Sequence, residues 1–325
     1  MRTTTSIIRT CGGLAVVGAF VATLSAALPA RETLPLAQSP ASAQTPRDQL
    51  LVTPAWLAAH LNDPDLVLLH VGEADEYRTA HIPGARLVDM EDVSTGHSED
   101  GRMLQTLPPD VLRERLQALG ISDGSRIVVY YGDDWVSPST RIIFALDHAG
   151  LGARTSLLDG GMQAWRQAGN AVTDRVPAAR RGRLSALRTR DIVVDAAWVQ
   201  RNLRTPGIAV VDGRAAVFYD GVQATHNARN GHIPGARSIP FTSITDDRLR
   251  VRSAAELAAL FRDAGIRPGD TIVGYCHIGQ QATAVLFAAR TLGYNVKLYD
   301  GSFEEWGGRA ELPVENPRAR GGRER

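Results

Sequence analysis

One cysteine of this chain stands where its side chain could attack a substrate. Cys276 follows the apolar run at residues 271–275 and precedes a helix-like run at residues 282–290. This pattern predicts a buried strand, a short loop that begins with the cysteine, and a helix whose N-terminus faces it. Unpaired backbone N–H groups and the positive end of the helix dipole favour a thiolate at that position. Cys276 is therefore the candidate nucleophile.

The alternative for Cys276 is the commonest state of a free cysteine, a buried and inert small apolar residue. The other cysteine, Cys11, lies in an apparent export leader, so the mature protein would hold one thiol and no internal disulfide. The position of Cys276 favours the reactive interpretation. With Gly279 three residues on, it lies at a strand–loop–helix junction, where α/β proteins bind ligands outside the carboxyl ends of their strands.

The elements that must position this cysteine occur twice in the chain. The hexapeptide His-Ile-Pro-Gly-Ala-Arg begins at His81 and again at His232. A Leu-Asp-Gly-Gly segment that begins at Leu158 has a Tyr-Asp-Gly-Ser counterpart that begins at Tyr299. Collinear matches of this kind indicate two homologous domains rather than a short-period solenoid.

Each copy alternates short β-branched runs with helical patterns. This alternation predicts an α/β fold in which each domain is a small parallel sheet flanked by helices. The predicted strands are residues 66–71, 127–131 and 156–158 in the first copy and 209–212, 271–275 and 296–299 in the second. The expected organisation is an N-terminal domain at 48–170, a polar linker at 171–190, a C-terminal domain at 191–316 and an arginine-rich tail at 317–325.

The repeat also separates the roles of the two domains. Cys276 aligns with Tyr131, and the first copy continues with Gly132 and Asp133 where the second has the compact cysteine loop. The N-terminal domain therefore cannot perform the chemistry predicted for Cys276.

The composition predicts a globular protein without a strong charge preference. The chain has 325 residues, of which 44% are hydrophobic, and its formal net charge is +1. That length accommodates two domains with a core each, and the charge indicates neither a nucleic acid nor an acidic partner.

The first 43 residues are typical of a secretory signal peptide. Arg2 and Arg9 precede a mostly apolar run at residues 11–28, and the Ala-Ser-Ala segment at residues 41–43 matches a cleavage site. Cleavage before Gln44 would place the protein in the periplasm or outside the cell, with no stable membrane partner. An uncleaved leader would instead anchor the protein to the membrane, because the apolar run approaches the length of a membrane span.

Four features together resemble the tandem-domain rhodanese family: the cysteine loop, the two repeated domains, the His-Ile-Pro-Gly-Ala segments, and the Val-Asp-Gly-Arg segment at residues 211–214. This family comprises the thiosulfate and 3-mercaptopyruvate sulfurtransferases, and the resemblance covers about residues 48–316. It implies a reaction without a cofactor, in which Cys276 takes the sulfane sulfur of a small anionic donor, thiosulfate or 3-mercaptopyruvate, as a persulfide. The sulfur then passes to a thiophilic acceptor such as cyanide or a thiol.

The resemblance also assigns roles to individual residues. Loop N–H groups would hold the negative charge of the thiolate and of the persulfide. The residues of this cradle are His277, Ile278, Gly279, Gln280 and Gln281. Arg214 resembles the family arginine that helps to hold the anionic donor, and a salt bridge with Asp212 is the structural alternative. The loop has no permanently charged side chain, so donor attraction is expected from Arg214 and from a partial charge on His277 near neutral pH.

The histidines that begin the repeated hexapeptides, His81 and His232, are predicted to be mainly structural, because the copy without a cysteine has one as well. His81 could nevertheless face the cleft between the domains, as its counterpart does in some mercaptopyruvate-type members. Four tryptophans also correspond between the copies and are predicted to lie in the core: Trp56, Trp165, Trp198 and Trp306.

Two other functions are alternatives at this point. A cysteine-dependent phosphatase needs an arginine six positions after the cysteine to clamp the phosphoryl group, and this chain has Ala282 there. A non-catalytic sulfur-relay, thiol-sensing or protein-binding module would keep the fold without catalysis, as the first domain does. The sequence contains no CxxC pair or histidine cluster at metal-ligand spacing, so no metal site is predicted.

Overall fold

The structure is a computed structural model that describes residues 45–318 except 97–100, 133–134 and 225–228. The predicted leader, its cleavage site and most of the arginine-rich tail lie outside the described residues. Within the described part of the chain, none of the helices has both the length and the apolar character that a membrane span requires.

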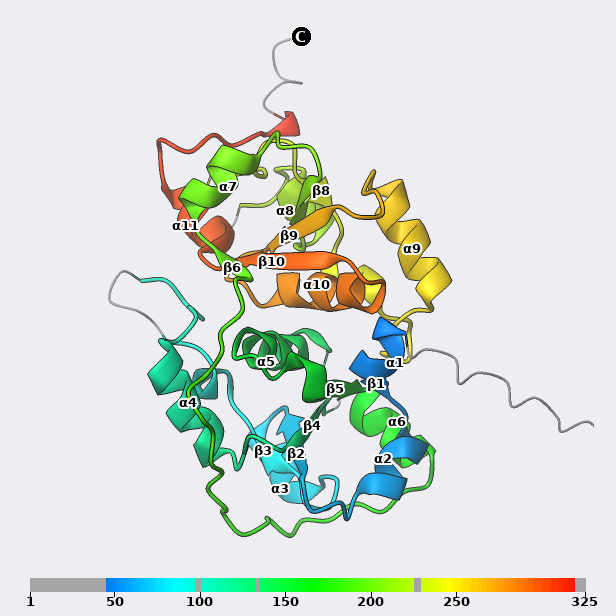
Figure 1. The fold of residues 1–325 in the computed structure, drawn as a ribbon. Helices are drawn as coiled ribbons and strands as arrows, with labels where there is room; N and C mark the ends of the chain where they lie inside the picture. Colours follow the sequence, from blue (N-terminus) through cyan, green and yellow to red (C-terminus); the bar gives the residue numbers. More distant parts are fainter. Residues whose placement is uncertain (1–44, 97–100, 133–134, 225–228, 319–325) are drawn as a thin grey trace, which may run out of the picture. The chain divides into compact units, whose positions relative to one another are not determined.

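Two five-stranded sheets, both parallel, form the framework (Figure 1). The first has the order β1 (Leu51–Val52), β5 (Thr155–Leu158), β4 (Arg126–Tyr131), β2 (Leu66–Val71), β3 (Arg86–Leu87). The second has the equivalent order β6 (Val193–Val194), β10 (Asn295–Tyr299), β9 (Thr271–Tyr275), β7 (Ile208–Asp212), β8 (Arg237–Ser238). The predicted α/β fold with a small parallel sheet in each copy is confirmed.

The helices that accompany the first sheet are α1 (Pro46–Leu50), α2 (Pro54–His60), α3 (Ala74–Thr79), α4 (Pro109–Ala118), α5 (Ser137–His148) and α6 (Gly161–Gln167). Those of the second are α7 (Ala196–Asn202), α8 (Ala216–Tyr219), α9 (Ala254–Asp263), α10 (Gln281–Thr291) and α11 (Ser302–Gly308). Three short 3-10 helices, η1 (Met90–Asp92), η2 (Gly152–Arg154) and η3 (Phe241–Ile244), complete the described elements.

The central strands are where the sequence placed them. β2 and β9 have the predicted bounds, and the other four predicted strands begin one residue earlier than expected. The edge strands β1, β3, β6 and β8 were not predicted. Each has only two residues, too few to show the alternation or the apolar run that identifies a strand.

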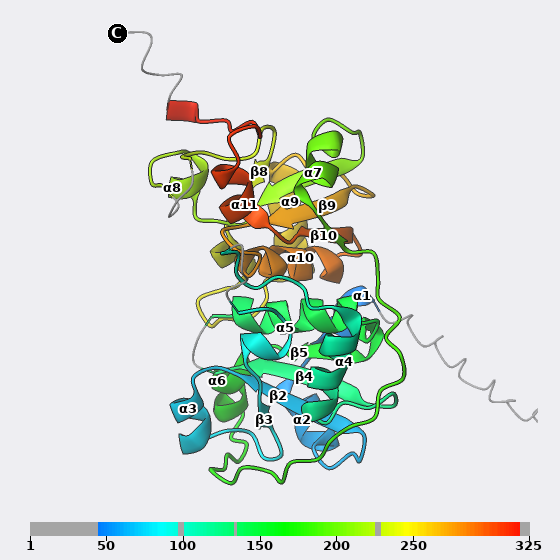
Figure 2. The ribbon, with the colours of Figure 1, turned by 90° about the vertical axis from the view of Figure 1, so that its left-hand side faces the viewer.

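Helices α5 and α10 pack against each other between the two sheets (Figures 1 and 2). One cluster of buried apolar side chains extends through both domains and includes Leu69, Ile143, Leu286 and Leu298. A separate cluster covers the outer face of each sheet. The two domains therefore share the core on their inner faces.

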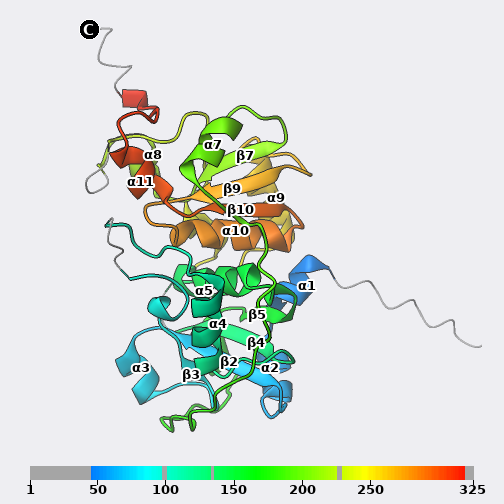
Figure 3. The same ribbon diagram turned by 60° about the vertical axis from the view of Figure 1, so that its left-hand side comes forward.

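The segment at residues 171–190 contains no helix or strand and runs along the first domain (Figure 3). Its Thr173 exchanges backbone hydrogen bonds with His81, and Gly182 donates to the carbonyl of Gln117. Leu184 is buried in the shared core. The polar segment is thus bound along much of its length by the N-terminal domain.

Candidate active site

Cys276 lies directly after β9, at the start of the loop that leads into α10. Its neighbours fix it firmly: β9 is a central strand, and residues 272–276 are all buried. The residue itself has 0% of its surface exposed. The thiol is therefore fully buried in the folded protein.

The start of helix α11 fixes the orientation of this loop. The carbonyl of Cys276 accepts from the N–H of Phe303 at 3.0 Å, and the carbonyl of His277 accepts from the N–H of Glu304 at 2.9 Å. The N–H of Cys276 donates to the hydroxyl of Ser302 at 3.3 Å. The first two loop carbonyls are consequently turned toward α11 and away from any anion that binds on the opposite side.

The remaining loop amides form a set of unused donors. In the described part of the chain, no hydrogen bond has the backbone N–H of Ile278, Gly279, Gln280 or Gln281 as its donor. Gln280 is the N-cap residue of α10, and its side chain makes no capping bond. Gly279 has a φ of +86°, a conformation that an L side chain strains. The loop and the helix N-terminus thus have the chemistry of an anion cradle.

Arg214 forms a buried ion pair with Asp212. Its Nη2 lies 2.6 Å from Oδ2, its Nε lies 3.0 Å from Oδ1, and the exposed side-chain fractions are 1% and 0%. The guanidinium also donates to the carbonyl of Gly231 and covers the ring of Phe303 at 3.9 Å. Burial opposes the charge of Arg214, but its bonds and charge interaction with Asp212 outweigh burial and raise its pKa. The salt bridge with Asp212, which was the structural alternative for Arg214, is therefore formed. A role for Arg214 in donor binding stays a prediction.

His277 is half-buried, and its ring meets Phe218 edge-on at 4.5 Å. Burial and the nearby charge of Arg214 lower the pKa of His277 from 6.5 to about 4, although Asp212 acts in the opposite direction. The expectation of a partial positive charge near neutral pH is wrong, because the site is too dry and already holds a cation. His277 is neutral at pH 7.

The two glutamines of the loop have different surroundings. Gln280 extends its Nε2 to Ser137 of the N-terminal domain at 3.4 Å. The Oε1 of Gln281 is buried and has no hydrogen-bond partner among the described residues. Ile278 is half-buried beside them. The predicted loop residues are thus brought together, with one contact from the other domain.

His81 does not face a cleft, so the alternative placed on it needs correction. It is 0% exposed, its ring stacks on Tyr77, and its Nδ1 and Nε2 lie 2.6 and 3.2 Å from the carbonyls of Tyr77 and Arg175. His232 stacks on Tyr219 in the same manner. Both histidines hold their own turns, because the Pro-Gly turn brings each ring back onto the preceding helix.

The four tryptophans divide into two pairs. Trp165 and Trp306 are buried in the core as predicted. Trp56 and Trp198 are half-buried, pack against the outer core clusters and lie under the charged ends of Arg126 and Lys297, so they belong to the core only in part.

The first domain confirms the alignment of Cys276 with Tyr131. Tyr130 and Tyr275 occupy equivalent strand positions, and each hydroxyl accepts from the N–H of the isoleucine in the repeated hexapeptide at 3.1 Å. Tyr131 therefore takes the position of Cys276, and its hydroxyl donates to the carbonyl of Leu249 at 2.6 Å. The counterpart of the thiol is a structural hydroxyl between the domains.

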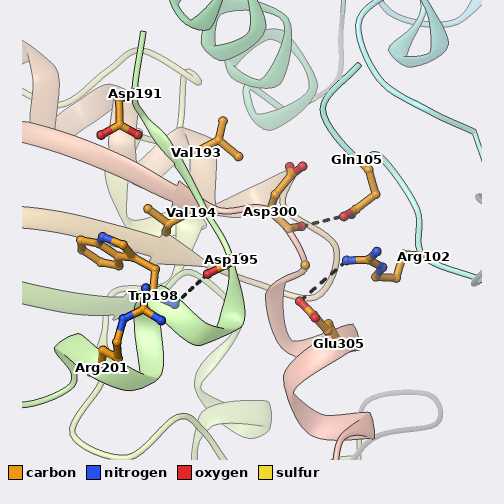
Figure 4. Close-up of a pocket in the computed structure, with 11 residues that line it drawn as sticks. Arg102, Gln105, Asp191, Val193, Val194, Asp195, Trp198, Arg201, Asp300 and Glu305 are labelled. Carbon is orange, nitrogen blue, oxygen red and sulfur yellow. Dashed lines mark hydrogen bonds and ion pairs between the residues drawn. The ribbon is translucent and has the colours of Figure 1, made fainter. Parts of the chain in front are cut away.

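The residues that link the cysteine loop region to the first domain through Asp300 were not predicted from the sequence. Asp300 accepts the N–H of Thr106 at 2.7 Å, and its carbonyl accepts from Gln105 at 3.2 Å (Figure 4). A groove of about 490 Å³ lies beside these contacts, with Arg102 and Glu305 paired at its edge. The repeated Asp-Gly segment was a signal for Asp300, but nothing in the sequence pointed to its partners in the first domain.

No group of acidic, histidine or cysteine side chains suited to a metal ion exists among the described residues. Ala282 occupies the first turn of α10, where a phosphatase of the kind considered above would need its arginine. In the described part of the chain, the arrangement is that of a single thiol beside a set of unused backbone donors.

Comparison with known proteins identifies relatives of the whole two-domain unit. Residues 53–168 and 195–309 each match the family model described as "Rhodanese-like domain". The "Probable 3-mercaptopyruvate sulfurtransferase" of Pseudomonas aeruginosa is 35% identical over 79% of this chain and 94% of its own length. The "Thiosulfate sulfurtransferase" of Azotobacter vinelandii is 31% identical over 82% and 97%. The crystal structure of YnjE has the same fold, with a TM-score of 0.75 and 23% identity over 84% of this chain and 70% of that chain.

Proposed function

This chain belongs to the rhodanese-like family and is a sulfurtransferase, and from that premise we propose how Cys276 carries the sulfur. The observation that supports this role is the set of loop amides at residues 278–281, which follow Cys276 directly in the chain and have no acceptor among the described residues. Such donors stabilise a thiolate before the reaction and an anionic persulfide after it.

The first half-reaction begins with attack of the Cys276 thiolate on the outer sulfur of the donor. A sulfur–sulfur bond forms, and the bond between that sulfur and the rest of the donor breaks. With thiosulfate, sulfite leaves with the electron pair. With 3-mercaptopyruvate, the three-carbon fragment leaves and takes up a proton to become pyruvate. The product on the protein is a Cys276 persulfide whose terminal sulfur the loop amides can hold.

In the second half-reaction, a thiophilic acceptor attacks the terminal sulfur of the persulfide. The sulfur–sulfur bond breaks, and Cys276 leaves as the thiolate that the cradle already stabilises. Cyanide would become thiocyanate, and a thiol would become a persulfide. No other group of the protein has to change its oxidation state.

For the donor, we propose a preference for 3-mercaptopyruvate over thiosulfate. Thiosulfate carries two negative charges, whereas 3-mercaptopyruvate carries one carboxylate. His277 of the loop is neutral at pH 7. The charge of the nearby Arg214 is balanced by that of Asp212. Backbone dipoles alone attract a dianion less strongly than fixed charges would.

Intact mass measurement and steady-state kinetics with both donors test this function. Wild-type protein given a donor should gain one sulfur atom at Cys276 and lose it on addition of cyanide. Cys276→Ser should keep its fold and lose at least about a thousand-fold in turnover, because the persulfide cannot form. A serine variant with substantial turnover, or a wild-type protein with no added sulfur, would overturn the mechanism. A higher kcat/KM for thiosulfate would overturn only the donor preference.

We further propose that the protein is exported, on the basis of the charged flank, apolar run and small-residue segment within residues 1–43. N-terminal sequencing of native protein tests this, with a start near Gln44 as the expected result. An intact Met1 form in the cytoplasmic fraction would contradict it.

A further inference from the structure

The N-terminal domain places one arginine against the cysteine loop. Thr140 of α5 meets Thr283 of α10 across the shared core, with the two hydroxyl oxygens 3.0 Å apart. The next residue, Arg141, sends its side chain toward the loop of the other domain, and only 1% of it is exposed.

Arg141 connects three segments through one end of its guanidinium. Its Nη2 donates to the carbonyl of Leu104 and lies 3.3 Å from Oδ1 of Asp300. Asp300 is in turn held by the N–H of Thr106. Leu104 and Thr106 are the chain neighbours of Gln105, which lies beside Asp300 in Figure 4.

The other end of the guanidinium faces the cysteine loop. Nη1 lies 3.9 Å from the point that a Cβ on Gly279 would occupy, and Ser302, which accepts the N–H of Cys276, lies beside the same point. Nε and Nη1 are buried and have no hydrogen-bond partner among the described residues. Buried donors of a cation are costly when they lack acceptors, so the position of this guanidinium is a notable feature of the interface.

We propose that Arg141 is a positioning residue for sulfur transfer, through which the N-terminal domain holds the cysteine loop in its anion-binding conformation. The proposal rests on the function assigned to Cys276. The guanidinium fixes Asp300 on one side and limits the movement of Gly279 on the other, so the loop amides stay directed at the sulfur. Its positive charge beside the loop also favours the anionic forms of the thiol and the persulfide. This gives the domain without a cysteine a defined part in the reaction.

The same helix pair supplies a matched control. Half-buried Arg290 of α10 and buried Asp147 of α5 form another ion pair between the domains, with Nη1 and Oδ2 3.3 Å apart. It lies toward the opposite ends of the two helices from the cysteine loop. Loss of this pair should weaken the domain interface without acting on the loop.

The test compares the full chain with the variants Arg141→Gln, Arg141→Lys and Arg290→Gln. For each, the rate of Cys276 alkylation is measured against pH, together with kcat, KM and thermal unfolding. Arg141→Gln should slow alkylation and kcat about ten-fold and move the alkylation profile to higher pH, because small misplacements of a reacting site are costly. Arg141→Lys keeps the charge and should lie closer to wild type. Arg290→Gln should stay within about two-fold.

Equal alkylation profiles in Arg141→Gln and Arg290→Gln would overturn the proposal, whatever their unfolding temperatures. If Arg141→Gln does not fold, Arg141→Lys decides, since a lysine that reproduces every wild-type rate and KM would show that the fork-shaped contact has no role. Failure of the proposed function is a separate result: wild-type protein would then form no persulfide, while the alkylation comparison would still report on the loop.

Discussion

At the scale of single residues, burial has opposite consequences for the groups around Cys276. The thiol of Cys276 is buried beside a loop whose amides at residues 278–281 have no acceptor among the described residues. Burial and the nearby charge of Arg214 lower the pKa of His277, because both disfavour a second cation. Arg214 keeps its charge because Asp212 is buried with it. The site therefore depends on dipoles and matched pairs more than on free charge.

The Asp212–Arg214 pair should matter more for stability than for donor attraction. Arg214→Ala leaves a buried carboxylate unpaired, so we expect a loss of about 3–5 kcal/mol in the free energy of unfolding. Arg78 and Asp75 provide a surface control, since the Asp75 side chain is 91% exposed. Arg78→Ala should cost less than about 1 kcal/mol. Denaturant unfolding at pH 7 measures both, and similar losses in the two variants would contradict this account.

His277 should make the folded protein sensitive to acid. Its folded pKa of about 4 lies below the ordinary 6.5, so the unfolded chain binds the proton first. Stability contributed by the neutral ring is complete above pH 6.5 and is lost as the pH falls toward 4. His277→Gln should therefore lose less stability than wild type between pH 7 and 4.5 in denaturant unfolding.

The thiosulfate rate provides a second measurement on the same variant. Because His277 stays neutral, lowering the pH from 7 to 5.5 should not raise the wild-type rate relative to His277→Gln. A rise that the glutamine variant lacks would show that the ring takes up a proton near its ordinary pKa.

At the scale of elements, the conformation of the loop depends on the turn between β9 and α10. Gly279 has a φ of +86°, and a Cβ there would lie 3.4 Å from the carbonyl of Asp300. The carbonyls of Cys276 and His277 are bonded to the start of α11, so the loop cannot adjust by rotating them freely. Strain at this turn should therefore displace the unused loop amides at residues 278–281.

Gly279→Ala tests this dependence. The left-handed conformation should cost the alanine variant about 1–2 kcal/mol, and turnover should fall more than stability because the amides move. Gly124→Ala is the control, since an added Cβ there meets no atom within 4 Å. Steady-state kinetics and thermal unfolding of the two variants decide. Normal turnover in Gly279→Ala would show that the loop tolerates a side chain at this turn.

At the scale of the whole molecule, the two domains share one apolar core, in which α5 and α10 pack against each other. The cluster that contains Ile143 and Leu286 belongs to both. Further bonds cross the interface, among them Tyr131 to the carbonyl of Leu249 and Asp159 to the N–H of Val251. The first domain thus supplies apolar contacts and hydrogen bonds to the inner face of the second domain.

Separation of the domains should expose this shared core. A chain of residues 191–316 leaves one face of α10 without its partner, so we expect it to aggregate or to lack a cooperative unfolding transition. Residues 45–318 serve as the control. Size-exclusion chromatography and thermal unfolding measure the outcome, and a monomeric 191–316 chain with cooperative unfolding would contradict the shared-core account.

The repeat, the α/β class, the central strands, the position of Cys276 and the family could all be predicted from the amino-acid sequence. These follow from local patterns, since apolar runs, turn residues and a cysteine before a helix are visible within a few residues of each other. The four edge strands were beyond this approach, because two residues carry no period.

The groups that meet at the loop from distant parts of the chain could not be predicted and became visible in the three-dimensional fold. In the fold, Arg214 is buried with Asp212, His277 is partly removed from water, and Arg141 of the first domain lies close to Gly279. His81 is likewise buried, and its ring is bonded to the carbonyl of Tyr77 in the preceding helix. Desolvation and charge pairing depend on how α5 packs against α10. The sequence pattern of each helix predicts its apolar face, but it does not predict which side chains of the other helix will lie against that face.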